Sequence, residues 1–400
     1  MAVDESYFAK ILRIEDPWTV TKVELDEHAG VSHVYVSTLR GKGFPCPVCR
    51  KECKVHDFYE REWRTLDLGS TKCIVHARVP RTECPEHGVK QINVVWAREY
   101  SRYTIDFEHK CMKLIREMPV NAAARFMRMS DDALWVILRH YVDEAMKNLD
   151  FQHVRRIGID ETSCKKGHDY ITVFVDMDSG RILFATPGRD SGTVGAFVEW
   201  FESHGGSAEH ITDVSCDMSQ AFALGVSSNL KNAKITLDRF HVMQLATKTV
   251  DDVRRSVQNE KRIKLSIRFP LLRRRKDLRK RDLEELGPVL KENMLIASAY
   301  MLKEMLGDLY LLENEEYGKH YLEKWIRLAS KGVHDKVKTL AKTISEHADG
   351  ILRWFVSRLS NGILEGLNSV IQAVKRMARG YKRHENMITM TYIRGSGIIL

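Results

Sequence analysis

Two aspartates stand where strand-like segments end, and carboxylates at such positions can hold metal ions. In "VRRIGID" the apolar residues Ile157 and Ile159 alternate with others, which predicts a strand that ends at Asp160. The segment "HITDVSCD" predicts a second strand that ends at Asp217. Ligands of an open sheet gather beyond the ends of its strands. If the two strands are neighbours, we therefore expect their carboxylates to lie close together.

Paired carboxylates of this kind suit phosphoryl transfer. Two nearby carboxylates repel each other, and hard divalent cations such as Mg²⁺ or Mn²⁺ relieve the repulsion because they prefer oxygen ligands. Two such ions about 4 Å apart clamp the attacking and leaving oxygens of an in-line displacement at phosphorus. The alternative for each acid is an ordinary turn or cap residue. We accept that alternative for Asp176 and Asp178, which stand at a predicted hairpin tip.

The spacing of cysteine and histidine near the N-terminus indicates another metal site. Two residues separate Cys46 from Cys49 in "FPCPVCRKEC", and two separate Cys84 from His87 in "TECPEHG". Two such turns joined by a β-hairpin describe a zinc ribbon, in which four protein ligands complete a tetrahedron around a structural Zn²⁺. A module this small needs the ion to fold. The alternative is a set of buried thiols. Other residues that could compete as ligands are Cys53, Cys73, His56 and His76.

Three helical segments follow the ribbon. Residues 107–147 have apolar positions three and four apart, Pro119 separates the first segment from the second, and Ser130 is the expected N-cap of the third. A helix of small residues, a tight turn and a longer helix are typical of a helix-turn-helix DNA-binding unit. The last helix carries few basic residues, among them Arg139 and His140. A plain helical spacer is therefore the alternative.

The segment after Val154 predicts the element order β-β-β-α-β-α-β-α. The expected strands are "VRRIGID", "YITVFVDMD", "RILFATP", "HITDVSCD" and "KITLDRFHV", and the expected helices include "VGAFVEWFESHG" and "MSQAFALGVSSNL". The last strand has Asp238 at its exit. This order is that of a ribonuclease H-like core. Two further strands, "WTVTKVELD" and "VSHVYVSTL", are expected before the ribbon.

The positive charge of the chain is concentrated in one stretch. The 400 residues contain 63 Lys and Arg against 54 Asp and Glu, a formal net charge of +9. Between Arg254 and Asp282 there are thirteen Lys or Arg against three acids, an excess of ten, so the remainder is close to neutral. Such a density of cations favours binding to a DNA backbone over a solvated helix face. The predicted phosphate contacts are Arg254, Arg255, Lys261, Arg262, Arg273, Arg274, Arg275 and Lys276.

Composition limits the remaining possibilities. With 44% hydrophobic and 29% charged residues over 400 positions, the chain is expected to form two or more globular domains. No apolar run approaches the roughly 18 residues of a membrane span, and the N-terminus shows no secretory signal. The expected location is the cytoplasm, where the eight cysteines indicate thiols or metal ligands rather than disulfides.

Five motifs, taken in order, resemble the DDE transposases of bacterial insertion sequences. They are "CPVC…CPEHG", "IGIDE", "SCDMSQAF", "LDRFHV" and "NGILEGLNSVIQAVKRMARGYK". The group that the chain resembles is the one often called ISL-three, which has an N-terminal zinc ribbon and a helix-turn-helix. The resemblance extends over nearly the whole sequence.

The resemblance implies a catalytic triad. Its two aspartates correspond to Asp160 and Asp217, and its glutamate corresponds to Glu365 in "NGILEGLN". Asp160 would bridge two Mg²⁺ or Mn²⁺ ions, and the other two acids would hold one ion each. The implied zinc ligands are Cys46, Cys49, Cys84 and His87, and the accessory residues are Asp238 and His241 in "DRFHV".

The segment that carries Glu365 is expected to be a helix that packs on the sheet. Its apolar stripe consists of Ile363, Leu364, Leu367, Val370, Ile371, Val374 and Met377. The residues expected on the other side are Glu365, Asn368, Ser369, Gln372, Arg376 and Arg379, of which the two arginines are candidate DNA contacts. A solvent-exposed face is the alternative interpretation of this polar side.

The expected fold class is α/β multidomain, in four parts. Residues 1–100 form a β-rich region that contains the ribbon (about 44–90), and residues 101–150 form the helix-turn-helix domain. Residues 151–249 and 346–390 form the ribonuclease H-like catalytic domain. The 126 residues between Asp238 and Glu365 are too many for a simple connection. The resemblance implies an all-helical insertion there, at residues 250–345, that grips DNA or a partner subunit.

The implied function is transposition. The protein would bind the terminal inverted repeats of its element, nick double-stranded DNA and join the freed 3′ end to target DNA, as a homodimer or larger assembly at the nucleoid. Neither a membrane nor a small-molecule substrate is expected. Two alternatives stay open: a catalytically silent, domesticated DNA-binding regulator, and a structure-selective nuclease on the same fold. The complete triad argues against the first, and cleavage without strand joining would indicate the second.

Overall fold

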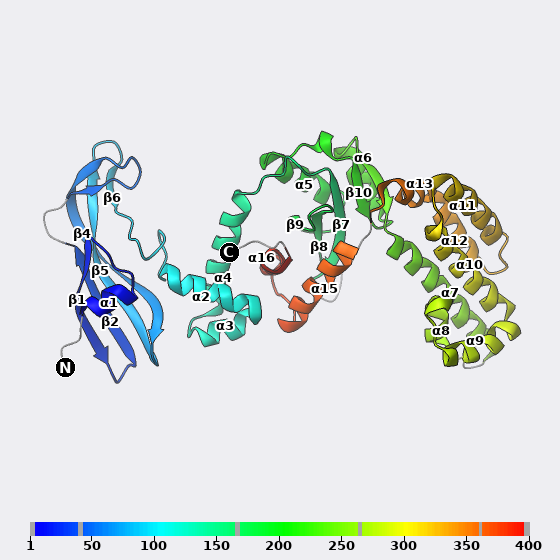
Figure 1. Ribbon diagram of the computed structural model, residues 1–400, viewed down its shortest axis with the longest axis horizontal. Coiled ribbons are helices and arrows are strands. Elements are labelled where there is room, and N and C mark those ends of the chain that lie inside the picture. Colours follow the sequence, from blue (N-terminus) through cyan, green and yellow to red (C-terminus); the bar gives the residue numbers. More distant parts are fainter. Residues whose placement is uncertain (1–4, 39–42, 165–168, 263–265, 360–361, 396–400) are drawn as a thin grey trace. The chain divides into compact units, whose positions relative to one another are not determined.

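The computed structural model describes residues 5–38, 43–164, 169–262, 266–359 and 362–395 (Figure 1). The chain divides into two compact units, residues 1–138 and 139–400. Among the described residues, none of the helices combines the length and the apolar character that a membrane crossing requires.

A mainly antiparallel sheet forms the core of the first unit. Its strand order is β1 (Trp18–Asp26), β2 (Val31–Thr38), β5 (Thr71–Cys84), β4 (Glu52–Leu68) and β3 (Phe44–Pro45), with β6 (Gly88–Gln91) paired to β5 and helix α1 (Glu5–Ile11) before β1. The ring of Trp96 packs edge to face against Trp18 and Trp63, at centroid distances of 4.9 and 5.6 Å. The strands predicted at "WTVTKVELD" and "VSHVYVSTL" are confirmed as β1 and, as far as Thr38, β2.

Three helices follow this sheet, as predicted. They are α2 (Ile105–Glu117), α3 (Val120–Phe126) and α4 (Asp131–Lys147). The hydroxyls of Thr104 and Ser130 accept backbone N–H groups in the first turns of α2 and α4, which stabilises both helix starts. Pro119 stands immediately before α3 and separates it from α2. The buried Ala123 and Ala124 let α3 approach its neighbours closely.

The second unit contains a mixed sheet. Its strand order is β11 (Lys234–Leu237), β10 (Asp213–Cys216), β7 (Arg156–Ser163), β8 (Tyr170–Asp176) and β9 (Ile182–Pro187). Strands β7, β8 and β9 pair antiparallel, whereas β10 runs parallel to both β7 and β11. The helices α5 (Gly192–Ser203) and α6 (Gln220–Asn229) connect the later strands, together with the 3₁₀ turn Ala208–His210.

The two faces of this sheet differ in character. On one face, Ile157 and Ile159 pack with Phe197 of α5 and Phe222 of α6 in an apolar core. Because side chains alternate along a strand, the even-numbered residues of β7 point to the opposite face. That face is covered by α15 (Gly362–Met377) against β7 and by α16 (His384–Gly395) against β9 (Figure 1).

The strand that we predicted to end at Asp160 is longer than expected. Strand β7 continues to Ser163 because the antiparallel neighbour β8 pairs with it along this whole stretch, with Tyr170 opposite Ser163. On its other side the parallel pairing with β10 reaches only Gly158. Asp160 therefore lies beyond the parallel pairing although its own strand continues. The strand that we predicted to end at Asp217 ends one residue earlier, at Cys216.

The chain after β11 is helical. The helices are α7 (Arg239–Lys261), α8 (Arg268–Leu272), α9 (Lys280–Glu292), α10 (Met294–Asp308), α11 (Glu315–Ser330), α12 (Asp335–Glu346), α13 (Ala348–Leu352) and α14 (Trp354–Ser357), with 3₁₀ turns at Arg275–Asp277 and Leu309–Leu311. Trp325 is fully buried in their common core, and its indole N–H donates to the carbonyl of Leu302 at 2.8 Å. Helix α7 runs without a break through the boundary predicted at residue 250.

Candidate functional site

The registers of the mixed sheet align three aspartates. In the paired part of the sheet, Ser215 of β10 lies opposite Gly158 of β7 on one side and opposite Thr236 of β11 on the other. Two residues further along each strand stand Asp160, Asp217 and Asp238. The backbone N–H of Asp238 donates to the carbonyl of Cys216 at 3.0 Å, so the alignment persists beyond the last paired residues. Residues at one level of a sheet point to the same face. The three carboxylates therefore form a row.

The pKa of the Asp160 carboxyl is affected by the other two carboxylates of this row. Burial, and to a smaller extent the negative charges of Asp217 and Asp238, raises the pKa of its carboxyl to about 6. The backbone N–H of Glu161 and the nearby His241 oppose the shift only in part. Burial and neighbouring negative charges make the ionised form of such a carboxylate energetically unfavourable. A bound cation offsets this penalty, so the carboxylate is a good ligand for a cation. The row thus fits a divalent metal ion.

Helix α15 runs along β7 and covers Asp160. A Cβ atom built on Gly158 would meet Leu364 at 2.9 Å. The side-chain amide of Asn368 donates to the carboxylate of Asp160, and that of Gln372 donates to the hydroxyl of Thr162 at 2.5 Å. Four residues of helix rise about 6 Å, and two residues of strand rise about 6.6 Å. The two periods match, so every fourth helix residue meets every second strand residue.

This packing corrects our prediction for the polar side of α15. We expected Asn368 and Gln372 to face away from the sheet, whereas both contact β7. Val370 and Met377, which we assigned to the packed stripe, are exposed. The reason is that the strand residues under α15 are themselves polar or small, so the helix meets them with amide groups. Asn368 is a site residue that the apolar periodicity misses.

Helix geometry indicates which side of α15 carries Glu365. Ile363 lies beside Gly180 in the β8–β9 turn, 3.6 Å from the position of a Cβ atom there, so this side of the helix faces β8 and β9. Successive helix residues are rotated by about 100°, which places residue 365 roughly opposite residue 363. Glu365 is exposed and stands one turn before Asn368, the residue that contacts Asp160.

Asp238 and His241 stand at the start of α7. The buried carboxylate of Asp238 caps this helix by accepting the backbone N–H of Phe240 at 2.8 Å. His241 Nε2 lies 3.8 Å from the carboxylate of Asp238, and His241 lowers the pKa of Asp160 by its charge. The accessory pair therefore belongs to the same cluster as Asp160.

We expect Asp160→Asn to stabilise the metal-free protein at pH 8. Raising the pKa from 3.8 to about 6 means that ionised Asp160 destabilises the folded state. The penalty is worth about 3 kcal/mol at roughly 1.4 kcal/mol per pKa unit, and one lost hydrogen bond offsets about 1 kcal/mol of the gain. The gain is present above about pH 6 and disappears below pH 3.8, where Asp160 is protonated in both states. Thermal unfolding in EDTA at pH 8 and pH 3.5 measures it, and an equal effect at both values would contradict the assignment.

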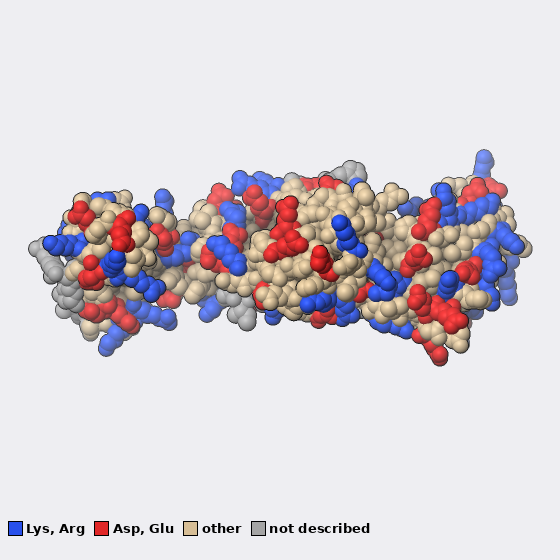
Figure 2. All heavy atoms as spheres, turned by 90° about the horizontal axis from the view of Figure 1, so that it is seen from above, with Lys and Arg blue, Asp and Glu red and all other residues tan. Residues whose placement is uncertain are grey.

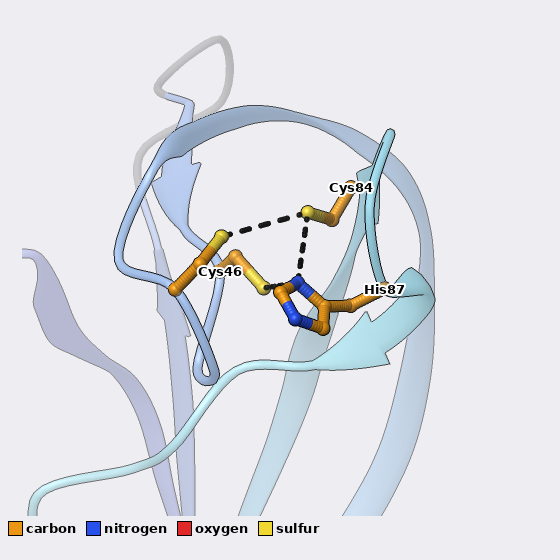
Figure 3. A group of neighbouring side chains, drawn as sticks. Cys46, Cys84 and His87 are labelled. Carbon is orange, nitrogen blue, oxygen red and sulfur yellow. Dashed lines mark hydrogen bonds between the residues drawn. The ribbon is translucent and has the colours of Figure 1, made fainter.

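The four predicted zinc ligands meet at the end of the first sheet. The ligand atoms of Cys46, Cys49, Cys84 and His87 all lie within 4.8 Å of one another (Figure 3). The sulfurs of Cys49 and Cys84 are 3.7 Å apart, and His87 Nδ1 lies 3.5 and 3.8 Å from the sulfurs of Cys84 and Cys46. Tetrahedral zinc with about 2.3 Å bonds to sulfur and about 2.05 Å bonds to nitrogen requires separations of roughly 3.8 and 3.6 Å. The group therefore fits zinc.

Backbone hydrogen bonds position the cysteine ligands of this cluster and favour the thiolate form of Cys84. Cys46 follows β3, and its N–H and C=O bond to Lys51 and Arg50, each at 2.8 Å, which closes the turn that holds Cys49. Although burial opposes it, the backbone N–H groups of Glu86 and His87, together with the side chains of Cys49 and Cys46, lower the pKa of the Cys84 thiol to about 7. A lower pKa favours the thiolate, which is the form that binds metal.

The competing cysteine and histidine ligands are engaged elsewhere. Cys53 lies beside the cluster, but its thiol donates to the carbonyl of Lys51. Cys73 lies in the apolar core of the sheet, where burial raises the pKa of its thiol to about 11. The ring of His76 is hydrogen-bonded to the ring of His33 at 2.8 Å. His56 lies 3.5 Å from the carboxylate of the neighbouring Asp57.

The predicted DNA contacts separate into exposed and internally paired cations. Arg254 is only 7% exposed and binds Asp251, and Arg274 binds Glu304 and Asp308, so both cations are neutralised within the unit. Arg139 donates to Asn386 of α16. The exposed candidates are Lys261, Arg262, Arg273, Arg275, Lys276, Arg376 and Arg379, and Arg255 is exposed but also paired with Asp251. Figure 2 shows Lys and Arg interspersed with Asp and Glu on the face that it displays.

A row of carboxylates, a cysteine-histidine cluster and a three-helix segment are the features expected of a metal-using enzyme that acts on nucleic acid. Comparison with known families identifies it further. Residues 157–391 match a family described as transposase, residues 93–142 match the helix-turn-helix domain of transposase family ISL3, and residues 42–87 match the zinc-finger of transposase IS204/IS1001/IS1096/IS1165. Because the first match covers more than half of the chain, the protein belongs to the ISL3 family of transposases.

Curated relatives agree with this assignment. The transposase for insertion sequence element IS1557 of Mycobacterium tuberculosis is 29% identical over 98% of this chain and 95% of its own length. The transposase for insertion sequence element IS1001 of Bordetella parapertussis is 27% identical over 92% of both chains. The predicted resemblance is thereby confirmed: the protein is a transposase with a zinc-finger segment, a helix-turn-helix DNA-binding domain and a DDE-type catalytic domain that uses metal ions.

Proposed function

We propose that this transposase binds the terminal inverted repeats of its own insertion sequence, cleaves the DNA there and transfers the freed 3′ ends to target DNA. The observation that carries the proposal is the alignment of Asp160, Asp217 and Asp238 at one level of the sheet. This row provides the oxygen ligands that Mg²⁺ prefers. We further propose at least a homodimer in the DNA complex, because two ends are joined, and action in the cytoplasm, where the chromosome lies.

We propose that the catalytic core is ribonuclease H-like. The strand order β11-β10-β7-β8-β9 supports this, since three antiparallel strands are followed by two parallel ones that return beside the first. The proposed parts are residues 1–100, with the ribbon, and the helix-turn-helix domain at residues 101–150. The catalytic domain comprises residues 151–249 and 346–390, and the helical insertion lies between them at residues 250–345.

The side chains of this chain have distinct tasks in the proposed reaction. Asp160, Asp217 and Glu365 would hold Mg²⁺, and the bound ions would activate water and stabilise charge on the scissile phosphate. Asn368 is a positioning residue, because its amide fixes the Asp160 carboxylate on the side covered by α15. The charge of His241 favours the ionised form of Asp160, which is the form that binds metal. Cys46, Cys49, Cys84 and His87 would hold a structural Zn²⁺.

A strand-transfer assay tests the proposed function. The purified protein is incubated with Mg²⁺ and linear DNA that ends in the inverted repeats flanking its gene, and joined products with supercoiled target DNA are quantified. Joined products that depend on the repeat sequence are expected. Cleavage without joining would indicate a structure-selective nuclease instead, and binding without cleavage would indicate a regulator.

The exposed cations of the basic stretch are expected to contact the DNA backbone. Replacing Arg273, Arg275 and Lys276 together with alanine should flatten the dependence of log Kd on log salt by up to about 0.9 for each phosphate that the variant no longer neutralises. The control removes the same charge from exposed residues of α11, with alanine at Lys319, Lys324 and Arg327. Equal slopes for the two triple variants would mean that the basic stretch faces solvent.

A further inference from the structure

A third cluster of metal-ligating side chains lies outside the two sites described above. Cys164 directly follows β7, Asp169 directly precedes β8, and His384 is the first residue of α16. Their sulfur, carboxylate and ring-nitrogen atoms all lie within 4.8 Å of one another. The proposed transposition chemistry uses none of these residues.

The fold brings these residues together from distant parts of the sequence. Ser163 pairs with Tyr170 at the end of the β7–β8 ladder, so Cys164 and Asp169 form the next pair outward. The backbone N–H of Cys164 donates to the carbonyl of Asp169 at 2.8 Å. Directly opposite residues of antiparallel strands have neighbouring side chains on one face. For Cys164 this is the face of Asp160 that α15 covers, because the two residues are an even number of positions apart on the same strand.

Helix α16 supplies the third side chain on that face. The chain returns from α15 to begin α16 at His384, and His384 Nε2 contacts the carboxylate of Asp169. Just before this return, the ammonium group of Lys375 donates to the carbonyl of Ser163 at 2.5 Å, which holds the end of α15 beside the same strand end. The pairing of β7 with β8 and the packing of α15 and α16 thus bring Cys164, Asp169 and His384 together.

We propose that Cys164, Asp169 and His384 bind a second zinc-class cation. A thiolate, an imidazole and a carboxylate are the ligand types of zinc, and a thiolate disfavours Mg²⁺ and Ca²⁺. Cys164 is buried, whereas the side chains of Asp169 and His384 are 23% and 35% exposed, so an ion can reach the cluster from solvent. Three protein ligands leave a fourth position for water.

The bound ion would fasten α16 to the β7–β8 end of the sheet. Helix α16 also packs on α15 and on β9, where the hydroxyl of Tyr392 accepts the backbone N–H of Ala185 at 2.9 Å. Because α15 immediately precedes α16 and packs on β7, the ion would also restrain the helix that carries Asn368 and Glu365. Ion binding therefore stabilises this unit whether or not the proposed catalysis is correct.

The competing interpretation is an Asp169–His384 ion pair beside a buried thiol. Such a pair needs no metal ion and gives Cys164 no role. Removing the thiol distinguishes the two interpretations, because only the metal site loses a ligand.

Zinc content provides the test. The full-length chain and its variants are equilibrated with buffered Zn²⁺, freed of unbound metal and measured for zinc per chain. We expect two ions in the wild type and one in both Cys164→Ala and His384→Gln. Cys111→Ala, which removes a buried thiol of α2 outside both clusters, should retain two. One ion in the wild type, unchanged in Cys164→Ala and His384→Gln, would overturn the proposal in favour of the ion pair.

Substitution with Co²⁺ provides a second readout, in case misfolding of a variant changes the amount of zinc bound per chain. The Co²⁺–thiolate absorption of the wild type should decrease in folded Cys164→Ala and stay unchanged in Cys111→Ala, and an equal spectrum for all three overturns the proposal. Cys46→Ser removes the ribbon ion and leaves the ion at His384. A failure of the ribbon assignment is thereby distinguished from a failure of this one.

Discussion

Replacing Asp160 with asparagine is expected to reduce DNA cleavage at least about a hundredfold and to leave binding of the DNA ends unchanged. The row formed by Asp160, Asp217 and Asp238 concentrates negative charge where metal ions would bind, and an amide is a much weaker ligand than a carboxylate. The same result is expected for Asp217→Asn and Glu365→Gln. Cleavage rates with Mg²⁺ and binding curves without it separate the two effects.

The matched control is Asp178→Asn. Asp178 is an acid of the same sheet, but it stands at the tip of the β8–β9 hairpin and pairs with Arg156. This variant should cleave at the wild-type rate. Among the three acids Glu365 is the most informative, because α15 carries it on an exposed position one turn before Asn368, the residue that contacts Asp160. Wild-type cleavage by Glu365→Gln would leave Asn368 as the contribution of α15 to the site.

Replacing Cys46 with serine is expected to remove one zinc ion per chain and to weaken binding of the DNA ends at least about tenfold. Zinc binding and folding are one process in a module of this size, so the loss of one ligand releases both turns of the ribbon. The ligand atoms of Cys46, Cys49, Cys84 and His87 lie at separations suited to tetrahedral zinc. Metal analysis and electrophoretic mobility shifts with end DNA measure the two losses.

Cys53→Ser supplies the control for this prediction. Cys53 lies beside the cluster, yet its thiol donates to the carbonyl of Lys51, a bond that a serine hydroxyl can also make. Zinc content and DNA affinity should both match the wild type. A wild-type zinc content in Cys46→Ser would refute the ligand set, and a normal DNA affinity without the ion would remove the ribbon from end recognition.

Local features were predictable from the sequence because they depend on neighbouring residues. The two Cys-x-x-Cys/His turns, the helix start at Ser130 and the turn at Asp178 are each specified by side chains within a few positions. Alternation and helical periodicity predicted most strands and helices for the same reason. The strand that contains Asp160 was misjudged, because its last residues are held by β8 rather than by their own pattern.

Amino-acid order by itself determined the metal-ligand types, the acids at the exits of β10 and β11, and the motifs that indicated the transposase family. Only the tertiary structure decided that Asp160, Asp217 and Asp238 share one level, that Asn368 faces the sheet, and that His384 meets Cys164 and Asp169. The physical reason is that these neighbours are set by strand register and by the match between helix and strand periods. Both are properties of paired elements, and neither exists within a single segment of the chain.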